Sequence, residues 1–105
     1  MDNRPKTPEE YVSLVDQALY EIGDLRMAME YDMDSMGGAT GFLDLLEAQV
    51  KELRASMVDG SYRFGKEDLP FMKLVDAQDE RLLPFKFLFA TINRTHKQGL
   101  NVDEI

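Results

Sequence analysis

Apolar residues recur every three or four positions through the first part of the chain, which is the spacing of one face of an amphipathic helix. This face comprises Tyr11, Leu14, Val15, Ala18, Leu19, Ile22, Leu25, Met29, Met33 and Met36. Residues 7–10 (Thr-Pro-Glu-Glu) indicate the helix start, because they combine a threonine cap, a proline in the first turn and the glutamate of a capping box. Gly37-Gly38 marks the end, since glycine adopts the left-handed conformation of a helix terminus at little cost. We therefore predict a long helix over about residues 8–35.

A second set of apolar positions with the same period predicts a helix over about residues 40–58, which Gly60 ends. The set consists of Phe42, Leu46, Val50, Leu53 and Met57. Because only a short turn separates this helix from the first one, we expect the two to form an antiparallel hairpin. The loop that follows holds Tyr62 and Phe64, two aromatic residues that we expect to pin the loop to the bundle.

The tripeptide Leu-Pro-Phe occurs at residues 69–71 and again at residues 83–85. Proline is tolerated in the first turn of a helix, where its missing N–H costs nothing, so each copy indicates a helix start. In both copies we expect the leucine before the proline and the phenylalanine after it to fasten the helix start to the core, much as a hydrophobic staple does.

The first of these two helices is predicted over about residues 69–80, with Asp68 as its N-cap. The second is predicted over about residues 84–98, with Gly99 as the glycine that terminates it. A single helix kinked at Pro84 is the alternative. We favour a bend and two separate helices, because the residue before a proline resists the helical conformation.

Together these elements predict an all-α fold, a small four-helix arrangement in which the long antiparallel hairpin packs with two shorter helices. The length predicts one domain over residues 1–105, with loose ends at about 1–6 and 101–105. The absence of cysteine excludes disulfides and thiolate metal sites. No apolar run approaches the roughly 18 residues that a membrane span needs. The N-terminus shows no secretory signal, so we expect a cytoplasmic protein that does not bind membranes.

The formal net charge is −8, and it is unevenly distributed. Residues 7–34 contain eight acids and a single base, Arg26. Binding a nucleic-acid backbone requires a basic surface, so we do not expect nucleic acid as a partner. A basic protein partner fits this charge. The alternative is a solvated acidic face that only keeps the protein in solution.

We predict no catalytic, cofactor-binding or metal-binding residues. Segment 32–37 (Asp-Met-Asp-Ser-Met-Gly) resembles the start of a calcium loop, but Leu43 occupies position 12, where a bidentate glutamate is required. His96 is the only histidine, which excludes the paired Glu-x-x-His motifs of di-iron bundles. We place His96 at the end of an apolar row, near a helix C-terminus that favours its charged form. A lone catalytic histidine is the alternative.

A second apolar row lies on the first predicted helix, on the side opposite the core positions. It consists of Tyr20, Met27 and Tyr31, with Gly23 and Asp24 between them. Aromatic residues and methionine are typical of adaptable interface cores. We therefore predict Tyr20, Asp24, Met27 and Tyr31 as partner-binding residues. The alternative is that other helices cover this long helix on two sides.

The last predicted helix is apolar on more than one side, because Phe87 and Ala90 point away from its core row. A helix that is apolar all round is buried all round. We expect it to be the central helix of the bundle. The alternative is that it forms part of a homodimer interface, and for this reason Phe87 is included among the predicted interaction residues.

The sequence thus predicts a small acidic protein-interaction or regulatory protein without catalytic activity, which binds a partner through its first helix or forms a homodimer. One alternative is an enzyme with a carboxylate-based site, built from Glu21, Asp24 or Asp34 together with Arg26. Another is an acidic mimic of nucleic acid that occupies a basic protein. The mimic requires the acids of the first helix to form one continuous exposed row.

Overall fold

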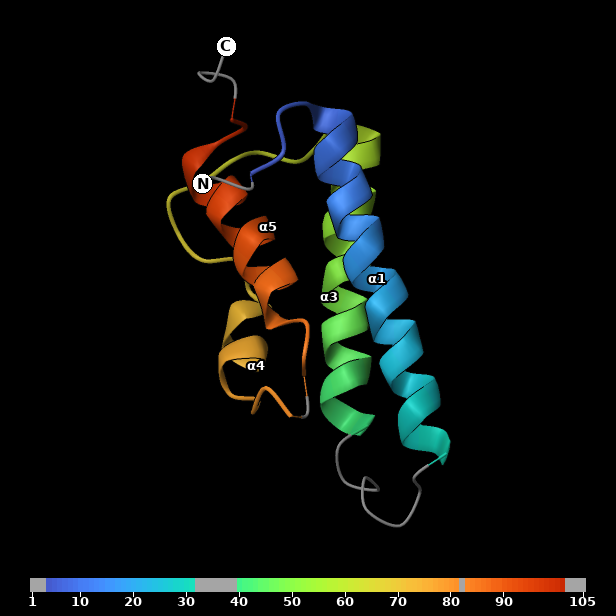
Figure 1. Cartoon of the computed structure of the whole chain (residues 1–105). Helices are drawn as coiled ribbons and strands as arrows, with labels where there is room; N and C mark the ends of the chain where they lie inside the picture. Colours follow the sequence, from blue (N-terminus) through green and yellow to red (C-terminus); the bar gives the residue numbers. More distant parts are fainter. Residues whose placement is uncertain (1–3, 32–39, 82, 102–105) are drawn as a thin grey trace.

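The computed structural model in Figure 1 describes residues 4–31, 40–81 and 83–101. These ranges contain four helices and no strand. The helices are α1 (Pro8–Tyr31), α3 (Thr40–Asp59), α4 (Met72–Asp76) and α5 (Lys86–Gln98). The all-α class and the small four-helix arrangement predicted from the periodicity are confirmed.

Helices α1 and α3 lie side by side in opposite directions, α5 packs against α1, and the short α4 contacts both α3 and α5 (Figure 1). One core joins the four helices. Its buried apolar members are Tyr11, Val15, Ala18, Ile22, Leu43, Leu46, Val50, Leu53, Leu69, Phe71, Val75, Leu83, Phe85, Leu88, Phe89 and Ile92. The apolar positions recognised in the sequence supply most of the α1 and α3 sides of this core, but they missed the buried Leu43. The opposite directions of α1 and α3 confirm the antiparallel hairpin (Figure 1).

The start of α1 carries the predicted cap. Thr7 Oγ1 accepts a hydrogen bond from the backbone N–H of Glu10 at 3.1 Å. Glu10 Oε1 accepts one from the backbone N–H of Lys6 at 3.1 Å. The arrangement is a capping box in which the glutamate reaches the residue before the cap. The predicted end of this helix, near residue 35, and segment 32–37 lie outside the described residues.

The predicted bounds of the third helix, about 69–80, are wrong, because α4 has only 5 residues. Asp68 does not cap it. The Asp68 Oδ1 atom instead accepts hydrogen bonds from Asn93 Nδ2 at 2.9 Å and from Lys97 Nζ at 3.0 Å, both on α5. Asn93 Oδ1 in turn accepts a hydrogen bond from the backbone N–H of Leu69 at 2.8 Å. The expected helix start is therefore a turn that is bonded to α5.

Helix α5 begins at Lys86, slightly later than predicted, and ends before Gly99, whose φ of 87° lies in the left-handed region. A separate α4 and α5 confirm the bend at Pro84. The anchoring role of the two Leu-Pro-Phe tripeptides is also confirmed. Their leucines and phenylalanines are buried, and their prolines are exposed.

The described residues of the two chain ends are fastened to each other, although we expected both ends to be loose. Arg4 Nη1 donates a hydrogen bond to the Gly99 carbonyl at 3.0 Å. The backbone N–H of Asn101 donates one to the Pro5 carbonyl at 2.9 Å, and both residues are buried. Among the described residues, no helix has the length and apolar character needed to cross a membrane.

Candidate protein-interaction surface

The side of α1 that faces away from the core carries the predicted interaction residues. Tyr20 is 66% exposed and Met27 is 60% exposed, and Asp24 between them is also exposed. In the described structure no helix covers this side, so the expected alternative of a helix covered on two sides is wrong for these three residues. The side chain of Tyr31 lies outside the described residues.

Tyr20, Gly23, Asp24 and Met27 stand at positions i, i+3, i+4 and i+7 of α1. In packed helices, four residues with this spacing form the hole that receives one side chain of a neighbouring helix. We call these four residues the α1 outer site. Two turns of helix separate Tyr20 from Met27, which is about 10 Å and leaves room for one side chain between them.

Gly23 forms the floor of the α1 outer site. Apart from its two chain neighbours and the nearby backbone of its own helix, no described atom lies within 4 Å of the position that a Cβ at Gly23 would occupy. Its φ is not positive, so the backbone does not require glycine. A glycine in a helix interior is less favourable than alanine by about 1 kcal/mol. Neither packing nor backbone geometry within the described chain explains this residue.

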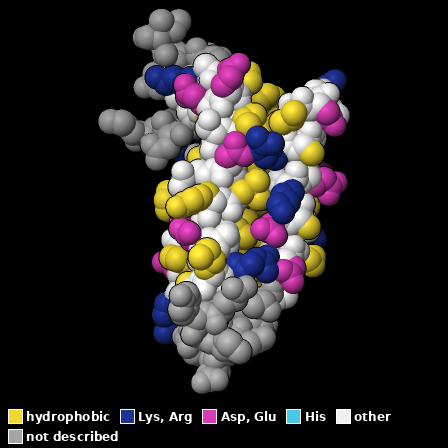
Figure 2. All heavy atoms as spheres, turned by 90° about the vertical axis from the view of Figure 1, so that its right-hand side faces the viewer, with side chains coloured by type: hydrophobic (Ala, Val, Ile, Leu, Met, Phe, Trp, Pro, Cys, Tyr) yellow, Lys and Arg dark blue, Asp and Glu magenta, His cyan; other side chains and the backbone are white. Residues whose placement is uncertain are grey.

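Ion pairs between α1 and α3 flank the α1 outer site and fix how α1 is turned. Arg54 of α3 pairs with Asp16. Arg26 of α1 reaches Asp44 at 2.7 Å and Glu47 at 3.3 Å. In Figure 2, which views the molecule from the side of α1, hydrophobic, acidic and basic side chains are interspersed. Because these pairs tie one edge of α1 to α3 and α5 packs against α1 as well, the side of α1 that carries Tyr20 and Met27 is left facing solvent.

These ion pairs bear on two alternatives that the sequence left open. Among the described side chains of α1, the acids do not form one continuous exposed row, because exposed Tyr20 and Met27 interrupt the series and Asp16 pairs with Arg54. Arg26 pairs with acids of α3, whereas the proposed carboxylate site would join it to Glu21 or Asp24. The third candidate carboxylate of that site, Asp34, lies outside the described residues.

Phe87 on α5 is 68% exposed, and Ala90 one turn later is also exposed. The prediction that this helix is central is therefore wrong. The helix carries apolar residues on two sides. Residues such as Phe89 and Ile92 pack on the core, and Phe87 projects from the other side. Phe87 does not lie in the α1 outer site, so the predicted interaction residues occupy two separate surfaces.

An aromatic cluster joins the loop after α3 to α1 and α5, and confirms that Tyr62 and Phe64 pin this loop. Tyr11 stacks on Phe64, and Tyr62 meets both rings edge-on. The Tyr11 hydroxyl donates a hydrogen bond to the Ile92 carbonyl at 3.0 Å and lies 3.1 Å from the Tyr62 hydroxyl. The Tyr62 hydroxyl lies 2.6 Å from His96 Nδ1.

Sequence reasoning missed the partner of His96. Burial lowers the pKa of His96, which favours the neutral ring, so the expected preference for its charged form is wrong. Burial also raises the pKa of the Tyr62 hydroxyl. The effect of the helix C-terminus on His96 could be expected from the local sequence. The residues that bury the ring come from a loop about one third of the chain away, which the local sequence does not reveal. The two aromatic residues in an otherwise polar loop were the only available signal.

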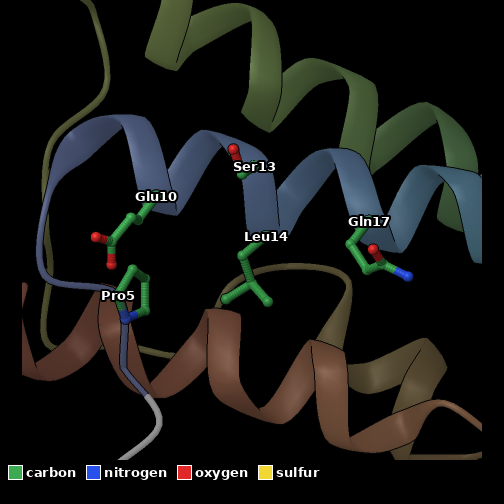
Figure 3. Close-up of a pocket in the computed structure, with 5 residues that line it drawn as sticks. All are labelled: Pro5, Glu10, Ser13, Leu14 and Gln17. Atoms are coloured by element: carbon green, nitrogen blue, oxygen red, sulfur yellow. The ribbon is translucent and has the colours of Figure 1, made fainter.

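Three pockets lie away from the α1 outer site. One of about 320 Å³ beside α1 is lined by Pro5, Glu10, Ser13, Leu14 and Gln17; in Figure 3 Leu14 points toward α5 and Ser13 away from it. Another, of about 300 Å³, is lined by Gln49, Glu52, Leu53, Ser56, Leu69, Pro70 and Phe71. The third, of about 150 Å³, is lined by Pro8, Tyr11, Val12, Met57, Gly60, Tyr62, Phe64 and Leu100. None of the three is lined by Glu21, Asp24 or Arg26.

The described residues contain no group of three or more histidine, aspartate or glutamate side chains that could hold a metal ion. The chain shows no significant similarity to a protein-family model, a curated protein or a solved structure. The geometry of its own residues therefore carries the functional argument.

Proposed function

We propose that this protein is a small acidic protein-interaction or regulatory protein without catalytic activity, which binds a protein partner through the α1 outer site. The observation that carries the proposal is the exposure of Tyr20 and Met27 on one side of α1, with open space at the Cβ position of Gly23 between them. Its cytoplasmic location, expected from the sequence, stays a prediction.

The chemistry of the α1 outer site favours one kind of partner. The site offers an aromatic ring and a thioether, two groups that adapt well to an apolar side chain. Asp24 is one of its four residues, and α1 carries five further acids. An apolar side chain that projects from a basic surface would suit both the apolar groups and the acids of the site. Opposite charges speed the encounter and align the two surfaces.

Gly23 provides the sharpest test of the proposal. In Gly23→Leu, the new Cβ has open space around it, and the rest of the side chain extends into the space between Tyr20 and Met27. We expect this variant to be at least as stable as the natural protein, since leucine favours the helix by roughly 0.8 kcal/mol over glycine. We also expect it to lose its partner. Affinity purification from the native cell, followed by sizing of the complex, measures this loss.

A matched control comes from α3, where Ala55 is exposed. Ala55→Leu adds a large apolar side chain to a helix surface outside the α1 outer site and should leave the complex intact. Tyr20→Ser combined with Met27→Ser should abolish the complex by removing the walls of the hole. If Gly23→Leu retains the partner as Ala55→Leu does, the α1 outer site is not the binding surface.

A further inference from the structure

A series of three polar contacts leads from the interior of the protein to His96. The Tyr11 hydroxyl lies 3.0 Å from the Ile92 carbonyl and 3.1 Å from the Tyr62 hydroxyl. The Tyr62 hydroxyl lies 2.6 Å from His96 Nδ1. Each of these contacts needs one hydrogen atom between its two polar atoms. Because Tyr11 is only 3% exposed, the hydrogen atoms have to come from the side chains themselves.

The number of hydrogen atoms fixes the direction of the series. A carbonyl only accepts, so the single hydroxyl hydrogen of Tyr11 goes to Ile92. The hydroxyl hydrogen of Tyr62 then goes to Tyr11, and the remaining contact needs a hydrogen on His96 Nδ1. If both hydroxyls donated in the opposite direction, the oxygens of Tyr11 and Ile92 would face each other at 3.0 Å with no hydrogen between them. Such a contact is unfavourable in a buried site.

Gly65 faces the other nitrogen of the His96 ring. A Cβ at Gly65 would lie 3.1 Å from His96 Nε2. Glycine carries a hydrogen in place of this Cβ, so a C–H group of Gly65 lies against Nε2. A nitrogen with a free lone pair fits beside a C–H group, whereas an N–H would find no acceptor there. This observation agrees independently with a hydrogen on Nδ1 and none on Nε2.

The same contact makes the loop after α3 sensitive to acid. The backbone N–H of Gly65 donates a hydrogen bond to the His96 carbonyl at 3.2 Å, which holds the loop against the ring. We propose that neutral His96 carries its hydrogen on Nδ1, and that a second proton, on Nε2, releases the loop at Gly65. The second proton needs an acceptor, which Gly65 does not offer, so Gly65 makes way for water. The loop then acts as an acid-sensitive latch.

Release of this latch changes what the protein exposes. Phe64 stacks on Tyr11, and Tyr62 meets the Tyr11 ring edge-on, so the loop covers a buried aromatic side chain of α1. Movement of the loop uncovers that side chain. The latch involves none of the residues of the α1 outer site, so this inference does not depend on the proposed function.

The charged groups around His96 favour the same direction as burial. Burial lowers the pKa of His96. Of the titratable groups that face the ring, Tyr62 belongs to the loop, and Tyr11 of α1 stands behind it. The bases near the ring lie at the N-terminus, in the loop and on α5, and a positive charge on any of them also disfavours the second proton. They are Arg4, Arg63, Lys66 and Lys97, of which Lys97 pairs with Asp68.

Nitrogen NMR of the isotope-labelled chain locates the hydrogen directly. His96 is the only histidine, so its two ring-nitrogen signals are unambiguous. At about pH 8, where a histidine is neutral, we expect a protonated Nδ1 and a bare Nε2. In Tyr11→Phe, the Tyr62 hydroxyl loses its acceptor and becomes free to donate to Nδ1, so the ring hydrogen should shift toward Nε2. Tyr20→Phe is the matched control, since this exposed tyrosine lies outside the series, and it should leave both signals unchanged.

Circular dichroism verifies that both variants fold. A bare Nδ1 in the natural chain at about pH 8 would overturn the proposal. So would a ring hydrogen that stays on Nδ1 in Tyr11→Phe and in the control to the same extent, because the direction of the series would then not depend on Tyr11.

Amide hydrogen exchange, corrected for its intrinsic dependence on pH, tests the latch between about pH 8 and about pH 5. The expected result is a loss of protection at the Gly65 N–H that follows the second protonation of the ring, while the N–H of Ile22, a fully buried residue of α1, keeps its protection. Constant protection at Gly65 during protonation of the ring would overturn the latch. An equal loss at Gly65 and Ile22 would also overturn it, because the whole chain would then be unfolding.

Discussion

Asn93 joins two segments that lie far apart in the sequence. Its side chain accepts a hydrogen bond from the buried backbone N–H of Leu69 and donates one to Asp68. The residue is only 8% exposed, so water cannot readily replace it. Hydrogen bonds to Asp68 from Asn93, and then from Lys97, lower the pKa of that carboxyl. Asp68 is thus held to α5 by Asn93, and α4 has no side-chain cap.

Substitution of Asn93 should be costly. In Asn93→Leu the buried N–H of Leu69 loses its acceptor, and we expect the free energy of unfolding to fall by about 1–3 kcal/mol. Asp68→Asn is the matched control, because an amide oxygen still accepts a hydrogen bond at this exposed site and the loss should be much smaller. Urea unfolding measures both. Equal losses would show that the Leu69 hydrogen bond does not carry the effect.

His96 should make stability depend on pH in a defined direction. Its pKa in the folded protein is lowered from 6.5 by burial, so the unfolded chain binds more protons between the lowered value and 6.5. The contribution of neutral His96 is therefore complete above about pH 6.5 and is lost as the pH falls through the lowered pKa.

The reference for this pH dependence is the variant His96→Asn, whose amide lies near the Nδ1 position and does not titrate. Urea unfolding from pH 8 to pH 5 should show the natural protein losing stability relative to the variant as the pH falls below about 6.5. A relative gain in stability at low pH would mean that the charge of the helix C-terminus dominates over burial.

At the scale of elements, the two Leu-Pro-Phe tripeptides act through their flanking residues. Phe71 is 1% exposed and meets Phe89 edge-on, with ring centroids 5.5 Å apart. Pro70 beside it is exposed. We expect Phe71→Ala to lower the free energy of unfolding by about 3–5 kcal/mol.

Pro70→Ala should lower the free energy of unfolding by no more than about 1 kcal/mol, because the unfolded chain becomes less restricted. Chemical denaturation of the two variants separates the roles of the two residues. A larger loss for Pro70→Ala than for Phe71→Ala would contradict the anchoring role.

The elements that the sequence predicted well are the long helices, whose apolar positions repeat over many consecutive residues. The hairpin of α1 and α3 follows from two extended sets of apolar positions and the Thr7 cap. The helix predicted over about 69–80 came out as the much shorter α4, because the residue that binds Asp68 lies 25 positions away. The angular position of Tyr20 and Met27 on α1 was predictable, but their exposure depended on where α5 packs. The separation of Phe87 from them depended on the same tertiary arrangement.

At the scale of the whole molecule, the charge of −8 is divided unevenly among the helices. Acids dominate α1, and bases dominate α5. The ion pairs that join α1 to α3 are partly exposed, and pairs of this kind contribute little to stability. Their main consequence is orientation, since they hold the acidic side of α1 and the α1 outer site toward solvent. The α1 outer site is therefore accessible to solvent.

The central claim is that the α1 outer site is a binding surface, and cross-linking in the native cell tests it most directly. A photoreactive phenylalanine analogue replaces Met27 in one variant and Ala55 in another. We predict that light produces a covalent adduct, with a second copy or another protein, from position 27 and not from position 55. Gly23→Leu should suppress that adduct. No adduct from position 27, or equal adducts from both positions, would contradict the claim.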